Sequence, residues 1–282
     1  MRRSTFLYSL ISATILISSC SGTKNVQQVN TGFGDSKEGA TVYFTSDISP
    51  KGLVEIYKAL GVKPEGRVAV KISTGESSKS NHLRPELIAD LVHEVNGTLV
   101  ECNTAYGGSR ATTEAHRKAI KERGFEAVAP VDIMDAEEDI QIPVKDKSHI
   151  QYDIVGSHIK NYDFVINLAH FKGHAMGGFG GVLKNQSIGF ASSAGKLYIH
   201  SAGRTTTKWL DDDQDGCLAS TDPVALDHAC IDLVFNHKDT EGDTASPLQQ
   251  RINRQHGLHI LEHAEKIGLG GRKYMLKNID KR

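Results

Sequence analysis

Cysteine is scarce in this sequence, with four residues among 282. Three of them, Cys102, Cys217 and Cys230, lie far apart, and no C-x-x-C pair occurs. These three cannot form a four-cysteine zinc or iron–sulfur site within one chain, so we expect no iron–sulfur cluster. One disulfide is allowed in an oxidising compartment, and Cys217–Cys230 is the favoured pair.

An excess of charge of one sign is also lacking. The 33 lysines and arginines balance 34 acidic residues, the formal net charge is −1, and no long basic block occurs. We therefore expect neither nucleic acid nor an anionic membrane surface as a partner. Long hydrophobic runs are missing too, because the apolar stretch 6–17 is too short to span a bilayer.

This short stretch has the features of an export signal. Two arginines precede it, and Ile17-Ser18-Ser19-Cys20 follows and resembles a bacterial lipobox. The resemblance implies cleavage before Cys20 and lipid attached to it; an ordinary secretory signal is the alternative. We thus expect a signal peptide (1–19), lipidated Cys20 with a flexible tether (20–38) and one domain (39–282), with a subdivision allowed near 135–160. The predicted location is the cell envelope, where lipid alone would anchor the protein on the periplasmic or outer side of a bacterial membrane.

Strand and helix signals alternate from residue 40 onward. Strand-like runs lie at 41–45, 67–72, 98–102, 126–134, 150–155 and 162–168, and helical patterns at 49–60, 84–95 and 112–123. Two later helices, at 223–235 and 256–267, precede a closing strand at 272–277. This order predicts an α/β fold with a mainly parallel sheet and helices on both faces. A second, smaller subdomain in the C-terminal part is allowed.

The segment 170–200 concentrates the residues that can perform chemistry. It contains three histidines, three lysines and seven glycines directly after a strand-like run. Glycine-rich loops at strand ends commonly build sites in α/β proteins, although a surface loop with scattered histidines is the alternative. The candidates are a catalytic pair, His174 and Lys184; two metal ligands, His170 and His200; and two ligand-binding residues, Lys172 and Asn185.

Two further loops follow strand-like segments and precede helices. Gly107 and Gly108 would allow backbone N–H groups to face an anion, and Arg110 could bind phosphate or carboxylate with two hydrogen bonds. Arg84 stands at the start of another helix at the same predicted sheet edge. The alternatives are an ordinary capped turn and a surface arginine.

An acidic loop matches part of a calcium-binding pattern. Asp211, Asp213, Asp215 and Asp222 fall at positions 1, 3, 5 and 12, and a glycine falls at position 6. Position 12 normally carries glutamate, and Asp222 also suits the N-cap of the helix that starts at Pro223. An acidic surface loop is therefore the favoured interpretation.

Several strings resemble the domain of unknown function 362 family, whose members are often fused to ferredoxin-type iron–sulfur domains. They are the string at 103–114, His170-Phe-Lys-Gly-His174, the string at 180–185 and Asp222-Pro-Val-Ala-Leu-Asp227. The resemblance covers roughly residues 40–277 and implies little biochemistry, since the family's function is unknown. The cysteines of the fused cluster domains are absent here.

A more distant resemblance is to the nickel-pincer lactate racemase. His174 and Lys184 stand ten residues apart around a glycine-rich core, and His200 follows sixteen residues later. The resemblance implies that His174 is an acid/base, Lys184 anchors the cofactor and His200 binds the metal, with Arg84 and Arg110 in matching strings. However, Ser109 stands where a second catalytic histidine is expected, and Asn81 replaces an acidic residue.

Racemisation needs a base on each face of the carbon, so we expect no racemisation of lactate. The sequence instead predicts an exported lipoprotein whose lactate-racemase-like pocket holds a metal ion, a nickel-pincer-like cofactor or a small anionic ligand. The alternatives are a non-catalytic periplasmic anion-binding protein and a structural lipoprotein. A redox protein partner and catalysis itself are left open.

Overall fold

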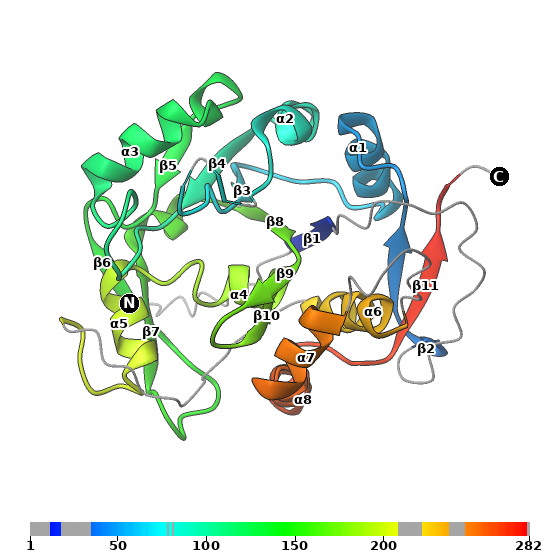
Figure 1. Cartoon of the computed structure of the whole chain (residues 1–282). Coiled ribbons are helices and arrows are strands. Elements are labelled where there is room, and N and C mark those ends of the chain that lie inside the picture. The colour runs from blue at the N-terminus through cyan, green and yellow to red at the C-terminus, as the bar shows by residue number, and fades with distance from the viewer. Residues whose placement is uncertain are drawn as a thin grey trace, which may run out of the picture.

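A parallel sheet forms the centre of the protein (Figure 1). The computed structural model describes residues 12–17, 35–77, 79–80, 82–207, 222–236 and 246–280. Five strands pair in the order β1 (Ser12–Ile17), β8 (Phe164–His170), β3 (Val68–Lys71), β4 (Gly97–Glu101) and β5 (Val131–Ile133). All four pairings are parallel. The predicted α/β class is therefore confirmed.

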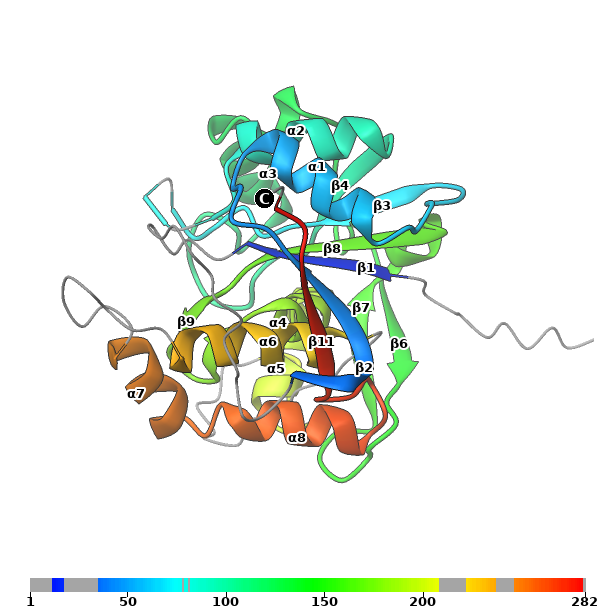
Figure 2. The same ribbon diagram turned by 90° about the vertical axis from the view of Figure 1, so that its right-hand side faces the viewer.

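Three helices cover one face of this sheet: α1 (Pro50–Ala59), α2 (Pro85–Glu94) and α3 (Thr113–Glu122) (Figure 2). Ser49 and Thr112 cap α1 and α3 by accepting backbone N–H bonds. The main apolar core lies on this face and includes alternate strand residues such as Val70 and Ile166. Side chains of a strand alternate between faces, so the intervening residues point to the other side.

The opposite face is covered by helices from the second half of the chain (Figure 2). They are α4 (Val182–Gln186), α5 (Ser193–His200), α6 (Pro223–Phe235), α7 (Ser246–Arg254) and α8 (Leu258–Lys266). A second core cluster joins α6, α7 and α8 to Phe171 and Phe179. Two 3-10 turns, η1 (Phe125–Ala127) and η2 (Ser157–Asn161), complete the helical elements of the described ranges. Helices on both faces are thus confirmed.

Three small sheets lie outside the central one. The pairs are β2 (Asp35–Phe44) with β11 (Tyr274–Asn278), β6 (Asp139–Pro143) with β7 (Tyr152–Gly156), and β9 (Lys172–His174) with β10 (Gly178–Gly180). Strand patterns at 41–45 and 150–155 therefore identified real strands that do not join the main sheet. The segment 170–200, taken as a loop from its glycine content, contains β9, β10, α4 and α5.

The N-terminal assignments meet the structure only in part. Residues 12–17, inside the predicted signal peptide, form the edge strand β1 beside β8. Cys20 lies outside the described residues, so its cleavage and lipidation stay predictions. The strand β2 starts at Asp35, inside the segment 20–38 that the sequence assigns to a tether. Across the described ranges, no helix is both long and apolar enough to cross a membrane.

Candidate functional site

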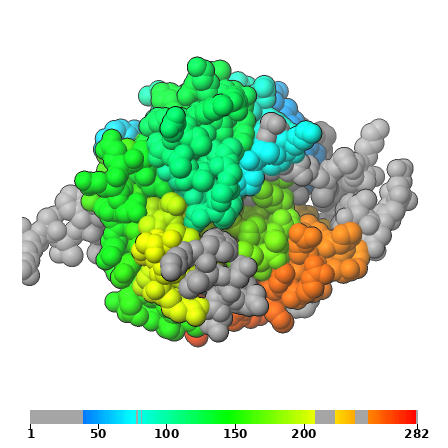
Figure 3. Space-filling view, turned by 60° about the vertical axis from the view of Figure 1, so that its left-hand side comes forward, coloured from blue at the N-terminus to red at the C-terminus, as the bar shows by residue number. Residues whose placement is uncertain are grey.

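A cavity of about 360 Å³ opens where three strands of the main sheet end. Residues at or just beyond the carboxyl ends of β3, β4 and β8 form its floor, which is where open α/β sheets bind ligands. The segment after β8 lies between the α1–α3 layer and the C-terminal helices in the space-filling view (Figure 3). The charged and histidine side chains of the lining are Lys71, Glu76, His82, Glu101, Arg110, His170, Lys172, His174, Lys184, Lys196 and His200.

Positive charge dominates this lining. Five lysine and arginine side chains face two carboxylates, Glu76 and Glu101, and both carboxylates bind the same arginine, Arg110. The positive excess therefore comes from four lysines, on β3, β9, α4 and α5. A concave surface of one sign concentrates its field and attracts counter-ions, so the cavity favours anions.

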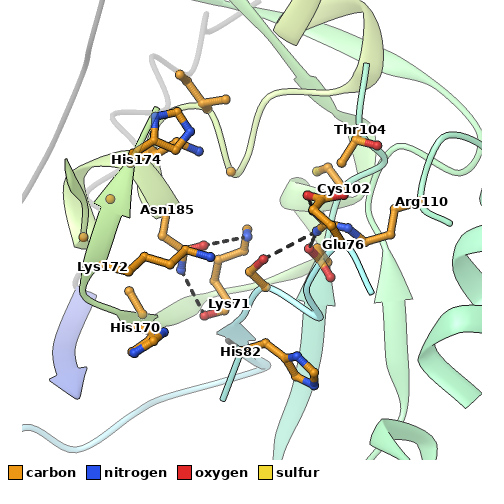
Figure 4. Close-up of a pocket in the computed structure, with 18 of the residues that line it drawn as sticks. Lys71, Glu76, His82, Cys102, Thr104, Arg110, His170, Lys172, His174 and Asn185 are labelled. Carbon is orange, nitrogen blue, oxygen red and sulfur yellow. Dashed lines mark hydrogen bonds and ion pairs between the residues drawn. The ribbon is translucent and has the colours of Figure 1, made fainter. Parts of the chain in front are cut away.

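Two of these lysines, Lys71 and Lys196, are almost fully buried. The Lys71 Nζ donates to the Ile72 carbonyl at 2.7 Å and to Asn185 Oδ1 at 3.1 Å (Figure 4). The Lys196 Nζ donates to the carbonyls of Asn103, at 2.6 Å, and Ala191. Burial lowers the pKa of Lys71 to about 8 and also lowers the pKa of Lys196. An anion in the cavity would stabilise the charged form of both amines.

His174 is held in one tautomer by the β9–β10 hairpin. Its Nδ1 accepts backbone N–H bonds from Met176 at 3.3 Å and Gly177 at 3.1 Å. Burial and the nearby Lys184 and Lys172 lower the pKa of His174 to about 4, so the ring is neutral at pH 7. Since Nδ1 accepts, the ring proton is on Nε2. His174 is thus suited to donate a hydrogen bond to an anion rather than to act as a base.

The helix that carries Lys184 and Asn185 is fixed by a buried aspartate. Asp227 on α6 accepts the backbone N–H groups of Val182 and Leu183, each at 3.0 Å. Gly181 must be glycine here, because a Cβ at this position would lie 2.1 Å from Asp227 Oδ1. The glycine therefore lets the start of α4 approach α6 closely.

Asn185 connects α4 to the sheet. Its Oδ1 accepts from the Lys71 Nζ at 3.1 Å, and its Nδ2 donates to Asn167 Oδ1 at 2.7 Å. Lys71 and Asn167 lie on the same face of neighbouring strands, because Lys71 pairs with Asn167 in the β3–β8 register. Asn185 thus positions a buried amine at the cavity floor.

A buried network anchors the other wall. The Glu101 carboxylate binds Arg110, the backbone N–H of Thr74 at 3.0 Å, the Thr74 hydroxyl at 2.7 Å and His116 Nε2 at 3.2 Å. Burial raises the pKa of Glu101, but Arg110 and His116 outweigh burial and hold this pKa well below its usual range. The carboxylate therefore stays charged and orients Arg110 toward the cavity.

Seven of the ten residues predicted as catalytic, ligand-binding or histidine metal ligands converge on this cavity. Its lining includes Arg110, His170, Lys172, His174, Lys184, Asn185 and His200. Arg84 does not line it; it is exposed at the start of α2, with Nη1 3.4 Å from His82 Nε2. Gly107 and Gly108 are also exposed and do not line the cavity, and a Cβ at either would meet nothing within 4 Å, so an anion cradle at their backbone stays a prediction. The exposed turn that they form is the alternative given above.

Ser109, which stands where the resemblance expects a second catalytic histidine, and the nearby His116 both make structural contacts. The Ser109 hydroxyl donates to the Glu76 carbonyl at 3.0 Å and accepts from Arg123 at 2.7 Å. His116 is fully buried between Glu101 and Asn103. Neither residue lines the cavity. Asn81, the other departure from the racemase pattern, is outside the described residues.

The metal assignments find less support in the geometry. Within the described ranges, no group of three or more His, Cys, Asp and Glu side chains could hold a metal ion, although His170 and His200 both line the cavity. In the acidic loop, Asp211, Asp213 and Asp215 lie outside the described residues, as does Cys217. Asp222 caps α6 by accepting the Ala225 N–H at 3.0 Å, and it also accepts from the Gly271 N–H. The capping role considered for Asp222 is thus confirmed.

Sequence reasoning missed Lys71, Lys196, Glu76, Glu101 and Cys102 as cavity residues. A lysine inside the apolar strand run of β3 and a glutamate at the end of β4 are unusual for a buried sheet, and this signal could have identified two of them. Lys196 had no such signal, because α5 was taken as part of a loop.

One protein-family model matches the part of the chain that forms the cavity. The family model described as "Domain of unknown function (DUF362)" matches residues 68–214, from the start of β3 to beyond α5. The chain belongs to the DUF362 family. All lining residues of the cavity, from Lys71 to His200, fall within the matched DUF362 segment. No curated protein and no solved structure matches the chain significantly. The DUF362 segment thus contains the whole cavity lining, while α6 supplies Asp227 from outside it.

Proposed function

We propose that this protein is an exported lipoprotein whose cavity binds a small anionic ligand. The observation that carries the proposal is the excess of cationic side chains over carboxylates around a 360 Å³ cavity at the carboxyl edge of the sheet. The neutral His174 and the amide of Asn185 add polar groups that can orient a ligand. Such a mixture of charge and directed hydrogen bonds is typical of small-molecule sites.

A nickel-pincer-like cofactor is the more specific form of the proposal. This form is supported by the three residues matched in the racemase resemblance, because all of them line the same cavity: His174, Lys184 and His200. Among the described residues no set of three or more metal-ligand side chains is assembled there, so such a cofactor would have to supply most of the metal's donor atoms itself. The cationic lining favours an organic anion over a bare metal ion. A non-catalytic anion-binding lipoprotein remains the alternative, because the position of a second base is occupied by Ser109, which lies outside the cavity.

Titration with a panel of anions tests the proposal. Isothermal titration of the full chain with lactate, succinate, citrate and inorganic phosphate should detect at least one ligand, and its affinity should fall as salt is added. Lys172→Ala and Lys184→Ala should each weaken that binding about tenfold, the effect of losing one charge-assisted hydrogen bond.

Lys118→Ala is the matched control, since Lys118 is an exposed lysine on α3 that pairs with Glu122 at 3.9 Å and does not line the cavity. This variant should bind with unchanged affinity. If no anion in the panel binds, or if all three variants bind like the unmodified protein, the cavity is not an anion site.

A further inference from the structure

We infer that Glu76 is a built-in competitor: its carboxylate occupies the Arg110 subsite of the cavity, and a ligand carboxylate displaces it. This inference rests on the proposed anion-binding function and deepens it by naming the ligand class. The class is a carboxylate with a second anionic group, such as a dicarboxylate. Figure 4 shows Glu76 and Arg110 together at one wall of the cavity, across from Lys172.

Arg110 is only partly satisfied by its contacts. One terminal nitrogen, Nη1, binds Glu101, and the other, Nη2, binds Glu76 Oε1. The Nε atom is buried and has no hydrogen-bond partner among the described residues. Nε and Nη2 form the edge of a guanidinium that holds a carboxylate through two parallel hydrogen bonds. Glu76 therefore uses one donor of a two-donor edge, and a ligand that used both would satisfy the buried Nε.

The Glu76–Arg110 pair is asymmetric in exposure. The Arg110 side chain is 6 % exposed, whereas the Glu76 side chain is 49 % exposed. Glu101 holds Arg110 from the buried side. Glu76 can therefore regain water contacts when it leaves, but Arg110 cannot, so the arginine needs an anionic replacement.

Only the side chain of Glu76 has to move. Its carbonyl accepts hydrogen bonds from Ser109 at 3.0 Å and from Arg123 at 3.3 Å. Arg123 also binds the carbonyls of Thr74 and Gly75. The backbone is thus held at Glu76 and at the two residues before it. Rotation of the side chain, which breaks the 3.3 Å hydrogen bond from the Tyr106 hydroxyl to Glu76 Oε1, opens the subsite without moving these carbonyls.

Lys172 provides for the second charge of the ligand. Burial and Arg110 lower the pKa of Lys172, while Glu76 raises it, so the three side chains share one electrostatic environment. Lys71 and Lys184 line the same cavity. A ligand whose first carboxylate binds Arg110 would place another anionic group among these lysines. A planar carboxylate is favoured over phosphate at Arg110, because the resident group is itself a carboxylate.

The test compares Glu76→Gln with a matched control, Glu55→Gln. Glu55 is a glutamate on α1 whose side chain is 48 % exposed and paired with Lys51 at 3.7 Å, remote in sequence from the cavity lining. Succinate, acetate and inorganic phosphate are titrated into each full-length protein at low ionic strength. Removing a half-exposed charged competitor should raise succinate affinity about tenfold in Glu76→Gln. Glu55→Gln should bind as the unmodified protein does.

The outcomes separate this inference from the proposed function. If the unmodified protein binds succinate and Glu76→Gln binds it equally or more weakly, Glu76 is no competitor and only the inference fails. If phosphate gains affinity and succinate does not, the carboxylate class is wrong. If neither protein binds any of the three anions, the inference fails, and the anion-binding function fails with it when lactate and citrate do not bind either. Tighter binding of succinate than of acetate in both proteins supports the second anionic group.

Discussion

Replacement of Glu101 is expected to destabilise the protein strongly. Glu101 is 2 % exposed, and its carboxylate accepts hydrogen bonds from Arg110, His116 and both donors of Thr74. In Glu101→Ala the buried guanidinium loses its inner partner, and breaking a buried charge pair in this way costs about 3–5 kcal/mol. Glu101→Gln keeps the shape and one acceptor oxygen but loses the charge, so we expect a cost of about 2–3 kcal/mol.

Urea unfolding followed by circular dichroism measures both costs, with Glu55→Gln as the exposed control that should change stability by less than about 0.5 kcal/mol. The pH dependence provides a second readout. The folded pKa of Glu101 lies well below its usual range, so its stabilisation is present above the unfolded pKa and is lost as pH falls through the folded value. Glu101→Gln should therefore lose less stability than the unmodified protein below about pH 4.

A loss below about 1 kcal/mol in Glu101→Ala would refute this reasoning. It would mean that water or another group compensates Arg110, and that the arginine is not held in place by this carboxylate. A large loss with no change in the acid dependence would instead indicate that packing, rather than charge, is the main contribution of Glu101.

Three further predictions follow from the buried groups and the N-terminus. The folded pKa of Lys71 is lowered to about 8, so the unfolded state binds more protons above that pH; stability should rise between pH 8 and 10, and less so in Lys71→Met, as urea unfolding at each pH would show. Asp227→Ala leaves two buried N–H groups at the start of α4 without their acceptor, so we expect a loss of about 2–4 kcal/mol by urea unfolding and weaker anion binding by calorimetry. Cys20→Ser should move the protein from the detergent phase to the aqueous phase; partition of the unmodified protein into the aqueous phase would contradict lipidation.

The periodicity of the sequence located the helices well, but it did not show which strands pair with each other. The predicted helix at 223–235 coincides with α6, and Ser49 and Thr112 cap α1 and α3, because capping and helical spacing are local properties. The patterns at 41–45 and 150–155 marked strands correctly but could not show that β2 pairs with β11, more than two hundred residues away. Pairing depends on the backbone of a distant segment, which leaves no local signature.

Glycine content shows the same limit at the site. The density of glycine in 170–200 correctly indicated that the backbone there approaches other groups closely, but it did not identify those groups. Gly181 makes room for Asp227, and a Cβ on Gly195 would lie 2.0 Å from the Ile154 carbonyl, so both glycines serve contacts within the protein. By contrast, a Cβ on Gly107 or Gly108, which were predicted to face an anion, would have no neighbour within 4 Å. A glycine therefore predicts a need for space or for an unusual backbone angle, and only the fold identifies the neighbour.

The charged residues extend this argument to function. His174 and Lys184 could be chosen from one segment because their spacing is local, and they do line one cavity. The chemistry of Arg110 depends instead on Glu101 at the end of β4 and on Glu76 in the loop after β3. As an isolated residue, Arg110 suggests a ready anion site. Between those two carboxylates it is a site already occupied on one side, and binding there becomes an exchange of one carboxylate for another.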